Sequence, residues 1–101
     1  MANVTISTAS TPTTVDSFFA NTYSTAKYIL TSTFAGVKEA TEVLVVTNGS
    51  VANVVTYGTI NTAGNALTSW SATMSGNIVQ LQGTTTNNGT VIRMTKQYNA
   101  N

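Results

Sequence analysis

The stretch EATEVLVVTNGSVANVVTYGTI, residues 39–60, decides the fold. It contains the continuous apolar run Val43-Leu44-Val45-Val46, which predicts a central β-strand that is buried on both faces. Asn48-Gly49 follows this run and is a strong hairpin signal, because both residue types tolerate the positive φ angles of a tight turn. Residues 51–60 then return as the predicted partner strand.

The remainder of the chain repeats this pattern of short strands and turns. Strand-forming residues fill further segments, while Gly and Asn separate them at intervals of roughly 8–12 residues. These segments are 24–34, 66–75, 78–82 and 90–98. We therefore predict an all-β domain of about seven antiparallel strands in a β-sandwich, with a small barrel as the alternative. A helical fold is not expected, because Thr, Val, Asn and Gly are poor helix formers.

The first fourteen residues differ from the rest. Val4 and Ile6 alternate with polar residues as in a short strand, but a Thr-rich segment around Pro12 interrupts the pattern. We predict an N-terminal arm over residues 1–14, with an edge strand as the alternative, a sandwich domain over 15–98 and a tail over 99–101. Our hypothesis is that Val4 and Ile6 lie across an adjacent subunit by adding to its sheet edge. Residues 16–19 are expected to form a helical turn or a loop.

Alternation also predicts the core. Trp70 is in phase with Ala72 and Met74, which indicates that its side chain points inward. The expected core residues are Trp70, Val43, Val45 and Leu81. Tyr98 lies near the chain end and is the best candidate for an exposed aromatic side chain.

Charged residues are scarce, and this restricts the function. They make up 7% of the 101 residues, against about 25% in a typical soluble domain. Four basic residues cannot build the phosphate-binding stripe of a nucleic-acid-binding protein. No apolar run has the roughly 20 residues that a membrane span requires, and the N-terminus has no signal-peptide pattern. So neutral a surface is either Thr-rich and soluble or largely covered by partners.

The sequence offers little catalytic chemistry. It has no His and no Cys, and its three acidic residues are Asp16, Glu39 and Glu42. On a strand, Glu39 and Glu42 point to opposite faces and make a poor metal or acid–base pair. A serine activated by Lys27 is the remaining enzymatic possibility, but no Gly-rich elbow surrounds any serine. We predict that the protein is no enzyme and has neither catalytic residues, nor a metal site, nor a cofactor.

From Val15 to Tyr98 the chain resembles a β-sandwich module of virion structural proteins from marine tailed bacteriophages of the cyanophage type. The segments that carry this resemblance are Val15-Asp16-Ser17-Phe18, Tyr23-Ser24-Thr25-Ala26-Lys27-Tyr28, Thr41-Glu42-Val43-Leu44-Val45-Val46, Val55-Thr56-Tyr57-Gly58-Thr59-Ile60, Val79-Gln80-Leu81, Asn87-Asn88-Gly89-Thr90 and Val91-Ile92-Arg93. Longer members of this group carry such modules within tail-fibre, baseplate and other virion proteins. A single copy behind its own Met, as here, favours a free-standing accessory protein.

The resemblance implies a bacteriophage virion structural protein. We expect a capsid decoration or cement protein that stabilises the particle by protein–protein contacts. The alternative is a tail-fibre, neck or baseplate component that binds a receptor or glycan. The expected partners are the major capsid protein or other virion proteins and further copies of the chain, with a trimer plausible, and neither nucleic acid nor membrane. The protein is expected to be made in the host cytoplasm and to reside in the virion.

Overall fold

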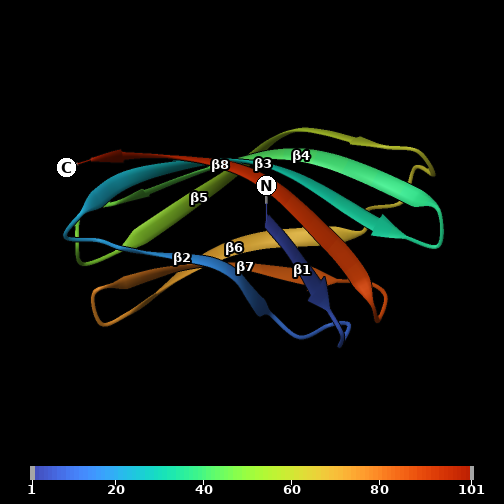
Figure 1. The fold of residues 1–101 in the computed structure, drawn as a ribbon, viewed down its shortest axis with the longest axis horizontal. Helices are drawn as coiled ribbons and strands as arrows, with labels where there is room; N and C mark the ends of the chain where they lie inside the picture. Colours follow the sequence, from blue (N-terminus) through green and yellow to red (C-terminus); the bar gives the residue numbers. More distant parts are fainter. Residues whose placement is uncertain (1, 101) are drawn as a thin grey trace.

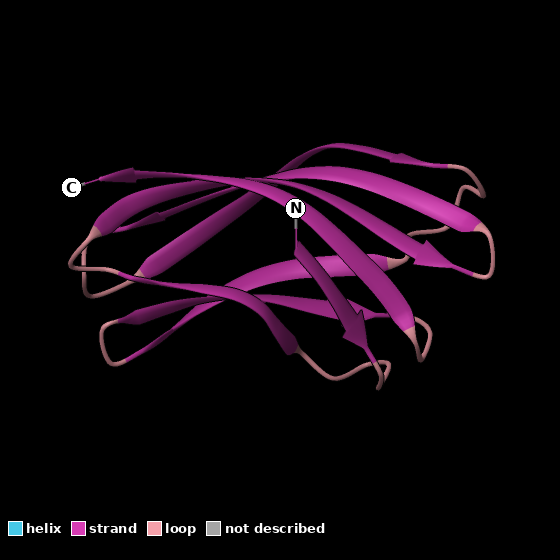
Figure 2. Cartoon of the chain, in the orientation of Figure 1, coloured by secondary structure: helices cyan, strands magenta, loops and turns pink. Residues whose placement is uncertain are grey.

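The computed structural model describes residues 2–100, which form eight strands and contain no helix (Figures 1 and 2). The strands are β1 (Ala2–Ile6), β2 (Thr13–Phe19), β3 (Tyr23–Phe34), β4 (Val37–Thr47), β5 (Ala52–Asn61), β6 (Thr68–Ser75), β7 (Ile78–Thr85) and β8 (Thr90–Ala100). The sequence predicts about seven of them. Asn101, the last residue of the predicted tail, lies outside the described residues, whereas Asn99 and Ala100 belong to β8.

The strands form two antiparallel sheets that pack face to face (Figure 1). The larger sheet has the order β1-β8-β3-β4-β5 and the smaller one β2-β7-β6. The predicted all-β sandwich is therefore confirmed, and the sheets do not close into the small barrel considered as the alternative. In the region described, no helix is long and apolar enough to cross a membrane.

The β4–β5 hairpin forms where Asn48-Gly49 predicts it. Thr47 pairs with Ala52, which leaves four residues in the turn, and Gly49 adopts a φ of 93° that favours glycine. The Asn48 side-chain oxygen accepts hydrogen bonds from the backbone N–H groups of Ser50 and Val51 at 2.9 and 3.1 Å. The local sequence alone is sufficient to specify this turn.

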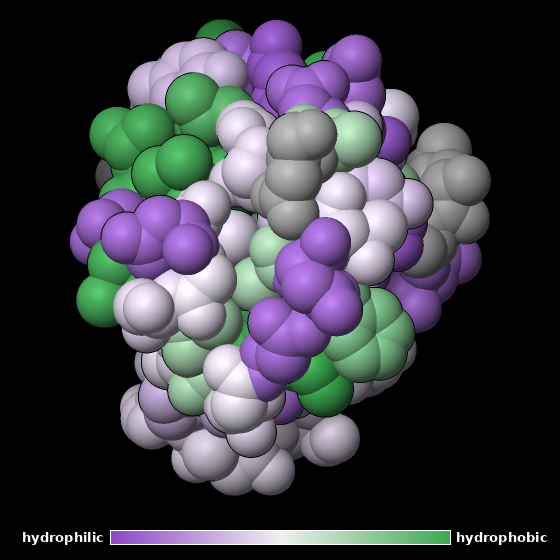
Figure 3. All heavy atoms as spheres, turned by 90° about the vertical axis from the view of Figure 1, so that its left-hand side faces the viewer, coloured by the Kyte–Doolittle hydropathy of each residue, from purple (hydrophilic) through white to green (hydrophobic). Residues whose placement is uncertain are grey.

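The two faces of β4 have different environments. Val43 and Val45 are fully buried, whereas Leu44 and Val46 are exposed on the outer side of the larger sheet. The prediction that this run is buried on both faces is therefore wrong. The smaller sheet covers the inner face, and none of the described residues covers the outer one. Figure 3, which looks onto the end of the sandwich with the β4–β5 turn, shows hydrophobic surface gathered at its upper left.

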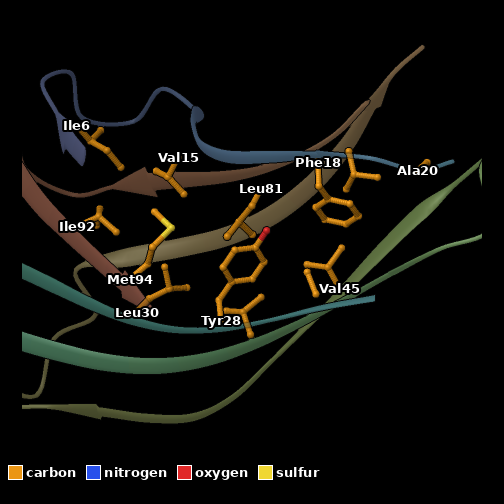
Figure 4. Close-up of a cluster of buried hydrophobic side chains, with 13 residues drawn as sticks. Ile6, Val15, Phe18, Ala20, Tyr28, Leu30, Val45, Leu81, Ile92 and Met94 are labelled. Carbon is orange, nitrogen blue, oxygen red and sulfur yellow. The ribbon is translucent and has the colours of Figure 1, made fainter. Parts of the chain in front are cut away.

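The core lies between the sheets. Tyr28, Leu30 and Met94 point from the larger sheet towards Phe18 and Leu81 of the smaller sheet (Figure 4). All five side chains are buried, and the expected core residues Val43, Val45 and Leu81 belong to the same cluster.

Trp70 packs against this cluster but is itself only partly buried. It lies opposite Gly83 in the β6–β7 ladder, and a Cβ atom on Gly83 would come within 2.8 Å of the indole ring. The missing side chain thus makes room for the indole, in the way that an aromatic residue commonly covers a cross-strand glycine. The indole nitrogen is buried without a hydrogen-bond partner.

The N-terminal segment lies within the sandwich. β1 pairs with β8 of the same chain over Ala2–Ile6, Ile6 is fully buried, and Val4 packs against the core. The N-terminal segment is therefore not a free arm: β1 is an edge strand of the larger sheet, which is the alternative prediction, and Val4 and Ile6 contact their own chain. The reason is that β3 pairs with only one edge of β8, and β1 pairs with the other edge. Residues 16–19 form part of β2, which corrects the expected helical turn or loop.

Candidate interaction surface

Seven large apolar residues are exposed on one side of the molecule. They lie on the outer side of β3, β4 and β5 or in the β4–β5 turn, and 37 to 72% of each residue's surface is accessible. We call this set the outer apolar face: Ile29, Leu44, Val46, Val51, Val55, Tyr57 and Ile60. Apolar patches that extend over several exposed side chains are often functional, so this face is a candidate site for contact with another molecule.

The open sheet edges next to this face carry no charge. β5 ends the larger sheet, β6 ends the smaller one, and the two strands lie against each other. Neither strand contains a charged residue or Pro, the features with which natural edge strands commonly prevent unwanted pairing. The opposite edge differs, because Pro12 precedes β2 and the pairing of β2 is irregular just before Asp16.

Asp16 links the two sheets at that opposite edge. One carboxylate oxygen accepts hydrogen bonds from the hydroxyls of Tyr28, at 2.7 Å, and Tyr98. The other oxygen accepts from the Lys96 ammonium at 2.7 Å. We call these four residues the Asp16 cluster. Asp16 comes from the smaller sheet and its three donors from the larger one, so the cluster joins the sheets.

The Asp16 cluster changes the proton affinities of its donors. Burial, and after it the bond to the Asp16 carboxylate, raises the pKa of Tyr28 well above its ordinary value. The same two causes, in the same order, raise the pKa of Tyr98. For Lys96 the bond to Asp16 is the main reason that its pKa is raised. All three groups therefore hold their protons firmly at neutral pH, which suits a structural role.

Tyr98 is not the exposed aromatic residue that its position near the chain end suggests. It is partly buried, and its ring lies 5.3 Å from that of Phe18 and 4.8 Å from that of Tyr23 between centroids. The exposed aromatic side chains include Tyr57 on the outer apolar face and Phe19 on the smaller sheet. The sequence pattern does not reveal that Tyr57 is exposed, because the exposure of a strand residue depends on which face of its sheet another element covers.

Glu39 and Glu42 lie on opposite faces of β4. Glu39 is 1% exposed and accepts hydrogen bonds from the backbone N–H groups of Leu67 and Thr68, at 3.0 and 3.1 Å, and from the Asn61 amide at 3.2 Å. It thus holds the segment between β5 and β6 in place. Glu42 faces outward, 3.9 Å from the Lys27 ammonium.

Lys27 stands on the outer side of β3, beside the outer apolar face. With Ile29, Thr95, Lys96 and Gln97 it lines a shallow hollow of about 340 Å³. This lining contains no serine, and the partner of Lys27 is the Glu42 carboxylate. Residues 2–100 contain no group of three or more acidic side chains that could hold a metal ion.

Comparison with known proteins gives a similarity of fold to a solved structure. No protein-family model and no curated protein sequence matches the chain. The crystal structure of the Acinetobacter phage vB_ApiP_P1 tailspike protein is similar in fold, with a TM-score of 0.61 and 17% sequence identity. The match covers 99% of this chain and 22% of the tailspike chain. At this identity the likeness concerns the fold, which a segment of a phage tailspike shares.

Proposed function

We propose that this chain is a structural protein of a bacteriophage particle, located at the tail, and that it acts by protein–protein contact without a catalytic step. The observation that supports this most is the tailspike match, which covers almost the whole chain. The outer apolar face agrees with it, because a protein that stays bound in a particle can hide such a surface. The neutral edges of β5 and β6 fit the same role.

A capsid decoration protein, the position expected from the sequence, is the second candidate. The outer apolar face favours it equally, since a cement protein also needs a permanent apolar contact with its neighbours. The two positions differ in copy number, because a coat lattice offers far more equivalent sites than a tail does.

Peptide mass spectrometry of purified virions, calibrated against the major coat protein, distinguishes these positions. A tail protein is expected at a small fraction of the coat protein, and it should be lost from tail-less heads purified in parallel. Abundance comparable to the coat protein, retained in tail-less heads, would support capsid decoration instead. Absence from both preparations would refute the virion function.

A further inference from the structure

We propose that the outer apolar face binds the same face of a second copy of this chain, so that two larger sheets pack against each other around a two-fold axis. A second copy is thus the partner of the outer apolar face. The biological role of this dimer rests on the proposed function. Its test uses the isolated protein, so the two can fail separately.

The outer apolar face is continuous across three strands. In the antiparallel register Leu44 lies between Lys27 of β3 and Val55 of β5, and Glu42 lies between Ile29 and Tyr57. Side chains directly opposite each other on neighbouring strands are in contact range, about 4.5–5.5 Å apart at Cβ. The exposed groups therefore form one sheet surface, on which a flat partner surface can pack.

The size of this surface matches the need of a stable dimer. Seven large residues, exposed to between 37 and 72%, present on the order of 500 Å² of apolar surface if each has roughly 150–200 Å² in full. A standard interface buries about 800 Å² per partner, of which roughly 65% is apolar in homodimers. A standard homodimer therefore buries about 500 Å² of apolar surface per subunit, which is the same order as the area of the outer apolar face.

Charge at the centre of the outer apolar face is balanced. Lys27 and Glu42 lie there between the apolar side chains, 3.9 Å apart. Lys38 and Arg93 also lie on the outer side of the larger sheet, beyond this central pair. A second copy can therefore cover the central residues without burying an unpaired charge there.

The composition of β4 supports the same occupant. Its run Val43-Leu44-Val45-Val46 has the pattern of a strand covered on both sides, yet the chain covers only the inner side. A second copy stacked on the outer side would cover Leu44 and Val46 with side chains of the same kind. Sheets stack in this way at a spacing of about 10 Å.

The test is the oligomeric state of the isolated protein by sedimentation equilibrium, from about 1 to 100 μM, a range that brackets weak dimers. The wild-type chain is expected to be a dimer. Leu44→Glu places a charge at the centre of the face and should weaken dimerisation at least about tenfold, because an unpaired charge would be buried. Phe19→Glu is the matched control: Phe19 is 57% exposed but lies on the smaller sheet, so this variant should dimerise like the wild type.

A second variant guards against a folding defect in Leu44→Glu. Val55→Glu changes a more exposed residue of the same face, and circular dichroism checks that each variant is folded. A monomeric wild type at about 100 μM, a stoichiometry other than two, or dimers that survive both substitutions would overturn the inference. If the isolated protein dimerises as expected but is absent from virions, the inference of a dimer stands and the proposed function is contradicted.

Discussion

The Asp16 cluster is expected to be a main contributor to stability, and Asp16→Ala tests this. The substitution removes the acceptor of three hydrogen bonds that connect the two sheets. It also leaves the Tyr28 hydroxyl without this partner in a residue that is fully buried. The loss therefore combines missing bonds with the cost of an unsatisfied buried donor.

The magnitude follows from the exposure of each partner. A hydrogen bond to a charged group contributes about 1.5–3 kcal/mol, and the two tyrosine bonds share one oxygen, so together they are worth about 3 kcal/mol. The Lys96 side chain is 39% exposed, and its ion pair adds about 0.5 kcal/mol after solvent screening. We expect a total near 3.5 kcal/mol, a large part of the roughly 5–15 kcal/mol that stabilises a typical domain.

Urea unfolding followed by circular dichroism measures this free energy, and thermal unfolding should show a decrease in Tm of roughly 14–28 °C for a domain of this size. Tyr28→Phe is the companion variant, because it removes the donor together with the need for an acceptor. Asp16→Ala should cost about 1 kcal/mol less in the Tyr28→Phe background than in the wild type. A cost below about 1 kcal/mol in the wild type, or equal costs in both backgrounds, would refute the reasoning.

Three further predictions concern other contacts. Gly83→Ala should destabilise by about 1–3 kcal/mol and change the tryptophan fluorescence, because the new methyl group would overlap the Trp70 ring 2.8 Å away; unchanged unfolding would contradict the close packing. Glu39→Ala should cost about 3 kcal/mol because two buried backbone N–H groups lose their acceptor, whereas Glu42→Ala, the exposed control, should change stability by less than about 0.5 kcal/mol. Stability should fall as the pH rises above about 10, since the unfolded chain then releases tyrosine protons that the folded Asp16 cluster retains. For each retained proton the slope should approach about 1.4 kcal/mol per pH unit, and a flat stability profile up to about pH 11 would refute this assignment.

Local patterns predict the strands and hairpins well in this chain. The all-β class and the β4–β5 turn at Asn48-Gly49 follow from neighbouring residues. Turn geometry and side-chain alternation are properties of a few consecutive residues, so they need no knowledge of the fold. Residues 16–19 are the exception, because pairing with β7 makes them a strand where local signals favour a turn.

Long-range partners decide the candidate site. Leu44 and Val46 have the composition of buried residues, and only the arrangement of the sheets leaves them exposed beside β5. Asp16, Tyr28 and Tyr98 are distant in sequence, and only the packing of β2 against β3 and β8 brings them together. The sequence by itself thus determines the strands, their turns and the sparse charge, because these depend on local geometry and composition. The tertiary structure decides which face is covered, because coverage depends on which strands meet across the sandwich.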